Sequence, residues 1–141
     1  MKTVDELSSA VPLSAAVMTS VLVVDDEIAV RRFAVRVLER EGYVVVEARD
    51  GVEALEVIKQ GSTLIEVVVS DIVMPRLNGV ELMQSLFGSH PDLPVILMSG
   101  YATGALAELG IAAPCAILPK PFPSERLLEE VRRCIRQRDR K

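Results

Sequence analysis

Short runs of apolar, mostly β-branched residues recur along the chain and alternate with segments of helical periodicity. Each run is nearly continuous in apolar residues, which is typical of parallel strands that are covered on both faces. The five runs are 21–24, 44–46, 67–69, 95–98 and 115–118. Their alternation with helices predicts an α/β fold, a doubly wound parallel sheet with right-handed crossovers. Periodicity alone leaves the order of the strands open.

Between these runs, apolar residues recur every three to four positions, which predicts helices with one buried stripe. In the first helix the stripe consists of Val30, Phe33, Ala34, Val37 and Leu38, with Arg31, Arg32, Arg36 and Arg40 mostly outside it. The last helix is expected from about Ser124, with Leu127, Leu128, Val131, Cys134 and Ile135 facing inward. A helix after Thr103 has only a short apolar stripe and is the weakest of the set.

Two of the predicted helices have a capping signal at their first turn. Asp50 is followed three residues later by Glu53, and Asn78 stands in the same relation to Glu81. The first side chain of such a pair accepts a backbone hydrogen bond from the third helical residue, and the glutamate reaches back to the cap. We therefore expect helices to begin at these two positions.

The length of 141 residues is that of one domain. We interpret residues 1–19, rich in Ser, Ala and Thr, as a flexible leader, residues 20–138 as the folded domain, and residues 139–141 as a basic tail. No DNA-binding or enzymatic output domain is expected to follow. The apolar runs are too short to span a bilayer and the leader is a poor signal peptide, so we expect a cytoplasmic protein.

Charge and cysteine content narrow the function classes further. The net charge of −4 and pI near 5.1 give the chain no overall attraction to nucleic acid or to an anionic membrane. The arginines of the last helix are interpreted as a solvated helix end. Cys115 and Cys134 have no metal-like spacing, and we interpret them as buried free thiols in a reducing compartment. The lone His90 cannot build a histidine-rich metal site.

Polar residues follow four of the five apolar runs at the point where each run ends. These residues are Asp25, Asp26 and Glu27 after the first run, Ser70 and Asp71 after the third, Ser99 after the fourth and Lys120 after the fifth. Taken singly, the acidic residues could cap a helix, the serine could be a turn residue and the lysine a surface charge. Because the carboxyl ends of parallel strands meet at one edge, their coincidence predicts a functional cleft.

Clustered carboxylates repel one another, and a hard divalent cation with oxygen ligands, Mg²⁺, would remove that cost. A carboxylate beside Mg²⁺ can attack phosphorus and form an aspartyl phosphate. A lysine and the metal would neutralise charge on the transferring phosphoryl group, and a hydroxyl such as that of Ser99 would bind one of its oxygens.

Four segments resemble the receiver domain of two-component response regulators, the CheY-like superfamily. They are VLVVDDE at 21–27, SDIVMPRLNG at 70–79, LMSGY at 97–101 and LPKPF at 118–122. The resemblance implies a flavodoxin-like, three-layer fold with a five-stranded sheet in the order 2-1-3-4-5. It implies Asp71 as phosphoacceptor, Mg²⁺ held by Asp25, Asp26, Asp71 and the Val73 backbone carbonyl, and Ser99 and Lys120 on the phosphoryl oxygens. It is also compatible with a cis bond between Lys120 and Pro121.

One position departs from the family pattern. Three residues before the lysine the family commonly has Tyr or Phe, which couples to the switch hydroxyl, whereas this chain has Ile117. Tyr101 is a candidate substitute for that aromatic ring, or a loop residue without such a role. Val73 and Tyr101 also occupy positions that control water access to the phosphoryl group in the family, so we expect them to slow its hydrolysis.

The resemblance implies a signalling switch, not an enzyme beyond its own Mg²⁺-dependent phosphorylation and dephosphorylation. The main hypothesis is a single-domain response regulator that takes a phosphoryl group from a sensor histidine kinase or a histidine phosphotransfer protein. It would then bind an unknown downstream protein, or form a phosphorylation-dependent homodimer. Two alternatives stay open: a hybrid-kinase receiver that relays phosphate onward, and a phosphorylation-independent binding module. A haloacid-dehalogenase type of phosphatase is disfavoured because Val73 stands where its second aspartate would be.

Overall fold

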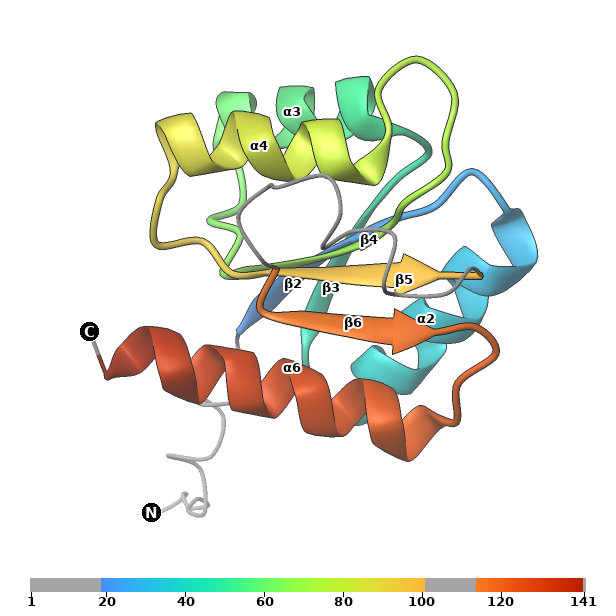
Figure 1. Ribbon diagram of the computed structural model, residues 1–141. Coiled ribbons are helices and arrows are strands. Elements are labelled where there is room, and N and C mark those ends of the chain that lie inside the picture. The colour runs from blue at the N-terminus through green and yellow to red at the C-terminus, as the bar shows by residue number, and fades with distance from the viewer. Residues whose placement is uncertain (1–18, 101–113, 141) are drawn as a thin grey trace.

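The fold is a parallel sheet between two layers of helices, as seen in a computed structural model that describes residues 19–100 and 114–140 (Figure 1). Within these residues the strands are β2 (Ser20–Val24), β3 (Val44–Ala48), β4 (Val67–Asp71), β5 (Val95–Ser99) and β6 (Ala116–Pro119). They form one five-stranded sheet in the order β3-β2-β4-β5-β6, with every neighbouring pair parallel. Counted along the chain this is the order 2-1-3-4-5, which confirms the predicted fold class.

Four described helices cover the two faces of the sheet. They are α2 (Ile28–Arg40), α3 (Gly51–Gln60), α4 (Gly79–Ser89) and α6 (Ser124–Asp139). Figure 1 shows α3 and α4 on one face and α2 and α6 on the other. None of these helices is long and apolar enough to cross a bilayer. The predicted helix after Thr103, residues 1–18 of the leader and Tyr101 lie outside the described residues.

Alternating strand residues divide the core into two halves. Val21 and Val23 of β2 pack toward α2 and α6, whereas Leu22 and Val24 pack toward α3 and α4. The same alternation continues in the central strands β4 and β5, all of whose residues are buried. Because successive strand side chains point to opposite faces, a sheet covered on both sides needs apolar residues at every position. That requirement explains the continuous apolar runs of the sequence.

The predicted helix starts agree with the structure. Asn78 caps α4 and accepts a hydrogen bond from the Glu81 N–H at 2.8 Å, while Glu81 accepts one from the Asn78 N–H at 3.0 Å. Asp50 caps α3 through the Glu53 N–H at 2.9 Å. The Glu53 carboxylate bonds instead to the Arg49 N–H at 2.7 Å, so the second half of this capping box is shifted by one residue.

Burial differs from the sequence-based expectation at three places. Strand β3 lies at the edge of the sheet, and its Val44 is 38% exposed, so this strand is not covered on both faces. Phe33, assigned to the buried stripe of the first helix, is 40% exposed, and Val35 is buried in the core. Arg31, placed mostly outside that stripe, is buried as well, because its guanidinium donates hydrogen bonds to Glu47 of β3 and to the Asp25 carbonyl.

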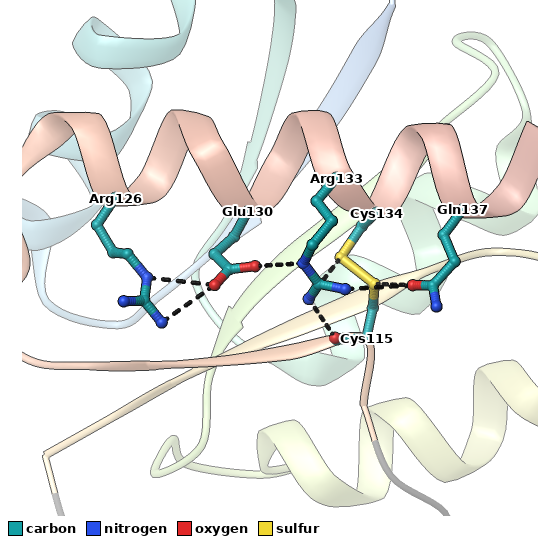
Figure 2. The surroundings of a disulfide bond; sticks show 6 residues. All are labelled: Cys115, Arg126, Glu130, Arg133, Cys134 and Gln137. Atoms are coloured by element: carbon teal, nitrogen blue, oxygen red, sulfur yellow. Dashed lines mark hydrogen bonds and ion pairs between the residues drawn. A yellow bond between two sulfur atoms is a disulfide. The ribbon is translucent and has the colours of Figure 1, made fainter.

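The cysteines correct a further prediction. Cys115 and Cys134 are not free thiols; they form a disulfide that joins the segment before β6 to α6 (Figure 2). Their Cα atoms are 6.0 Å apart, which suits such a bond. Cys134 does face inward as predicted, but the periodicity of a helix says nothing about which residue of a neighbouring strand it meets. The pattern of the sequence around these two cysteines therefore did not predict their disulfide.

Candidate functional site

The register of the sheet brings the predicted site residues to one edge. Asp71, the last residue of β4, pairs with Met98 of β5, the residue before Ser99. Ser99 in turn pairs with Pro119 of β6, and its carbonyl accepts a hydrogen bond from the Lys120 N–H at 2.7 Å. Asp25 follows the last residue of β2, which lies beside β4. The strands β2, β4, β5 and β6 thus all end at the same edge of the sheet.

The Lys120 ammonium stands among the carboxylates of this edge. Its Nζ lies 3.1 Å from Asp71 Oδ1, 3.2 Å from Asp25 Oδ2 and 3.6 Å from Glu27 Oε1. The bond between Lys120 and Pro121 is cis, as the resemblance allowed. Lys120 is therefore part of the site, not a solvated surface charge.

Three carboxylates come together in a group that could hold a metal ion. One ligand oxygen from each of Asp25, Asp26 and Asp71 lies within 4.8 Å of the others. Asp25 is fully buried and Asp71 nearly so, whereas Asp26 is exposed. Hard carboxylate oxygens with one side open to water are the donor set that Mg²⁺ prefers. The chemistry of these residues therefore fits that ion. The Val73 carbonyl stays a prediction as a further ligand; the Val73 side chain is 57% exposed.

The electrostatics of the site disfavour two ionised carboxylates without a metal. Burial raises the pKa of Asp71, and the negative charge of Asp25 raises it further, against the lowering effect of Lys120. Burial also raises the pKa of Asp25, opposed by the Glu27 N–H and by Lys120. Burial alone would lower the pKa of Lys120, but the attraction of Asp25 and Asp71 outweighs it and raises that pKa. A cation bound here would relieve this repulsion.

Asp25 is held at both its side chain and its backbone carbonyl. Its Oδ1 accepts a hydrogen bond from the Glu27 N–H at 2.9 Å, which fixes the side chain at the start of α2. The Arg31 guanidinium donates to the Asp25 carbonyl at 2.8 Å and to Glu47 Oε1 of β3 at 2.9 Å. Sequence reasoning missed Arg31, since an arginine among other arginines on a helix has no distinguishing signal. It ties the backbone of the acidic segment to the edge strand.

Asp71 is held by its own loop. Its Oδ1 accepts the Ile72 N–H at 3.0 Å, and its carbonyl accepts the Ser70 hydroxyl at 2.9 Å. The loop closes where the Gly79 N–H donates to the Ile72 carbonyl at 2.9 Å. A Cβ atom on Gly79 would overlap the Asp71 carbonyl oxygen. Only glycine lets the first turn of α4 approach Asp71 this closely.

A second arginine that sequence reasoning missed fixes the far side of the same loop. Arg76 has a left-handed φ of 68° and donates from Nε and Nη2 to the Asp50 carboxylate at 2.9 and 3.1 Å. Burial alone would raise the pKa of Asp50, but the Glu53 N–H and Arg76 together lower it. The cap of α3 thus also anchors the loop after Asp71.

The profile of the response regulator receiver domain matches residues 21–132 of this chain. The chain belongs to the response regulator receiver family. Phosphorylation of an aspartate and binding of Mg²⁺ are typical of this family, whose members act as signalling switches. At the usual aromatic position, Ile117 pairs with Leu97 of β5 and is half-buried.

Similar receivers occur in proteins of different construction. The chain is 43% identical over 121 residues to the sensor kinase CckA of Brucella abortus, covering 85% of this chain and 13% of that protein. It is 40% identical over 118 residues to the response regulator MprA of Mycobacterium tuberculosis, covering 83% and 50%. The crystal structure of a receiver domain from the hybrid histidine kinase CckA matches with a TM-score of 0.68 and 36% identity, covering 82% of this chain and 98% of that one. The chain thus spans half or less of these curated relatives.

Proposed function

We propose that this receiver accepts a phosphoryl group on Asp71. The Asp71 carboxylate oxygen attacks the phosphorus of a phosphohistidine; an O–P bond forms, the P–N bond breaks, and the imidazole leaves with the electron pair. The position of Lys120, within 3.1 Å of Asp71 and 3.2 Å of Asp25, is the observation that carries this proposal. An ammonium fixed beside the attacking oxygen can stabilise negative charge on the phosphoryl group as it transfers.

Asp25, Asp26 and Asp71 would hold Mg²⁺, with the Val73 carbonyl as a further ligand. When bound, the ion neutralises charge on the carboxylates and on the phosphoryl oxygens. The chain's own contribution is to fix the donors. The Glu27 N–H and Arg31 orient Asp25, while Ile72 and the close approach of Gly79 orient Asp71. Asp26 stays exposed, so the ion can enter from water.

Phosphorylation would switch the protein through Ser99 and Lys120. The new oxygens attract the Ser99 hydroxyl and the Lys120 ammonium more strongly than the free carboxylate does. A complete switch, from about 1:99 to 99:1, needs about 5.5 kcal/mol of differential binding. Both residues lie at the ends of adjacent strands, β5 and β6, and β6 packs against α6, so a change there reaches that helix. This face would bind the downstream protein or a second copy.

An apolar groove beside the site would take the phosphodonor. Its lining includes Val30 and Phe33 of α2 and Pro121 and Phe122 after β6, next to Lys120, and it encloses about 480 Å³. The Phe33 and Phe122 rings lie 6.0 Å apart. The exposure of Phe33 in this groove supports a protein donor, a sensor histidine kinase or a histidine phosphotransfer protein, that covers it. No role for nucleic acid or membrane is proposed, and we propose action in the cytoplasm.

The main proposal is a single-domain regulator that acts through protein contacts, with a phosphorylation-dependent homodimer as one form of output. The likeness to a receiver of the sensor kinase CckA favours a second candidate, a receiver of a hybrid kinase that relays the group onward. The contact of Lys120 with Asp71, within a group of three carboxylates, argues against a phosphorylation-independent binding module.

Transfer in both directions tests and separates these functions. A phosphorylated histidine phosphotransfer protein and an autophosphorylated sensor kinase are each mixed with the receiver, Mg²⁺ and, in parallel, its Asp71→Asn variant. We expect the labelled phosphoryl group to move from the donor to the wild-type receiver only. Rapid return of the label from the receiver to the phosphotransfer histidine supports the relay. Stable retention supports the stand-alone regulator, and no transfer from any donor supports the binding module.

A further inference from the structure

The disulfide lies at the opposite end of β6 from the site, and its two sulfurs are not equivalent. Cys115 precedes β6 and is half-buried, whereas Cys134 of α6 is 0% exposed. A cavity of about 290 Å³ lies beside the bond and is lined by both cysteines, by Pro114 and by Arg133 and Gln137 of α6. An incoming thiol can therefore reach Cys115, while Cys134 is shielded.

A cation stands next to the shielded sulfur. One nitrogen of Arg133, Nη2, lies 3.9 Å from Cys134 Sγ and donates to the Cys115 carbonyl at 2.8 Å. The other edge of the guanidinium is fixed by Glu130, whose Oε1 is 2.8 Å from Arg133 Nε. Figure 2 shows Arg133 in a row of α6 side chains with its guanidinium beside the sulfurs. A cation at this place stabilises a thiolate on Cys134.

We propose that Cys115 and Cys134 form a reversible redox site whose reactant is a thiol reductant, glutathione or a dithiol protein. The reductant's thiolate bonds to Cys115 Sγ, the disulfide breaks, and the electron pair leaves on Cys134 Sγ beside Arg133. A second reductant thiol then displaces the Cys115 sulfur. Both cysteines end as thiols with the reductant's two protons, and the reductant ends as its own disulfide. The reverse exchange with an oxidised thiol restores the bond.

Three features support reversibility over a purely structural bond. Disulfides of reducing compartments are mostly transient or redox-sensing, and the proposed site of action is such a compartment. A partly exposed sulfur bonded to a sulfur that leaves as a stabilised thiolate is the arrangement that speeds exchange. The contact between Arg133 and the Cys115 carbonyl, together with the buried residues Leu127 and Val131, would still hold α6 on the sheet after reduction. The two cysteines would then stay close enough to close again.

Equilibration in glutathione buffers tests the site itself. The full chain is equilibrated across a series of buffers from reducing to oxidising, its thiols are trapped with a maleimide, and the adducts are counted by intact mass. We expect a change from two adducts to none within the series while the far-UV circular dichroism stays constant. Absence of adducts in every buffer, or two adducts in every buffer, would overturn the proposal. So would a loss of the helical signal on reduction.

Single substitutions test the direction of attack. With Cys134→Ser, the remaining Cys115 is expected to form a mixed disulfide with oxidised glutathione in the folded protein. With Cys115→Ser, the buried Cys134 is expected to react at least tenfold more slowly. Equal rates in the two variants would contradict attack at Cys115.

Arg133→Gln tests the leaving group, with Arg132→Gln as its control. Arg132 lies on the same helix but is paired with Glu41 at 2.8 Å and does not contact the sulfurs. We expect the dithiothreitol reduction rate to fall several-fold in Arg133→Gln, to stay close to wild type in Arg132→Gln, and to recover largely in Arg133→Lys. The same rate in all four proteins would remove Arg133 from the mechanism. Should Arg133→Gln not fold, the ratio of the Arg133→Lys rate to the wild-type rate at rising pH decides in its place, because both proteins meet the same thiolate concentration and arginine keeps its charge. A ratio that falls as the lysine loses its charge supports the cation, and a constant ratio opposes it.

Discussion

The ammonium of Lys120 lies 3.1 Å from the Asp71 carboxylate and 3.2 Å from that of Asp25. One cation therefore opposes, for two carboxylates at once, the rise in pKa that burial and mutual repulsion cause. A parallel sheet produces this contact because β4 and β6, on either side of β5, end at the same edge.

Replacement of Lys120 tests its part in phosphoryl transfer. In Lys120→Gln we expect the rate of labelling by acetyl phosphate to fall by about 10²–10³, as for other preorganised groups that stabilise charge in a transition state. Lys59→Gln removes an equal charge from an exposed position of α3 and is expected to leave the rate unchanged. A similar decrease in both variants would point to a general effect of net charge.

The stability of the metal-free protein should depend on pH through Asp25 and Asp71. Both have a folded-state pKa above the ordinary value of 3.8, so the native state binds their protons more tightly than the unfolded chain. Their contribution is present in full below about pH 3.8 and is lost as pH rises through the folded pKa values. Asp71→Asn should therefore unfold at higher denaturant concentration than wild type at pH 7, without Mg²⁺.

Asp92→Asn, on an exposed loop, makes the same change in charge and controls for it. Chemical denaturation of the three proteins from pH 4 to pH 8 provides the comparison. A wild-type stability that rises across this range by the same amount in Asp71→Asn would contradict the electrostatic account of the site.

Binding of Mg²⁺ should stabilise the native protein. At a concentration ten times the dissociation constant, the free energy of unfolding should rise by about 1.4 kcal/mol. Asp26→Asn should lose most of this gain with little cost to the metal-free protein, because Asp26 is exposed. Glu129→Gln, on the exposed side of α6, should keep it. Thermal unfolding with and without Mg²⁺ measures this stabilisation. An equal shift of the unfolding temperature in Asp26→Asn and Glu129→Gln would show that the ion binds elsewhere.

Two glycines of α4 make a matched pair. A Cβ on Gly79 would overlap the Asp71 carbonyl, whereas one on Gly88 would meet nothing within 4 Å. Gly79→Ala should destabilise the protein by about 1–3 kcal/mol and slow phosphorylation by displacing Asp71. Gly88→Ala should be neutral or stabilising by up to about 1 kcal/mol, since alanine favours helix. Urea unfolding and acetyl phosphate labelling of both variants would check this, and a harmless Gly79→Ala would refute the role of the close approach.

The sequence predicted those features that one segment specifies by itself. The buried strands, the cap of α4 by Asn78 and the ends of the strands at Asp71 and Lys120 were all visible in local patterns. What it missed depends on contacts between distant segments. Arg31 is buried because its guanidinium donates hydrogen bonds to Glu47 and to the Asp25 carbonyl. Phe33 is exposed because no described element covers it. Cys115 meets Cys134 only once α6 packs on the sheet.

The account rests on Asp71 as the acceptor, and intact mass after treatment with acetyl phosphate tests this most directly. With Mg²⁺ we predict one phosphoryl adduct on wild type that hydroxylamine removes, and none on Asp71→Asn or on wild type without Mg²⁺. An adduct of equal yield on folded Asp71→Asn, or no adduct on folded wild type, would contradict the account.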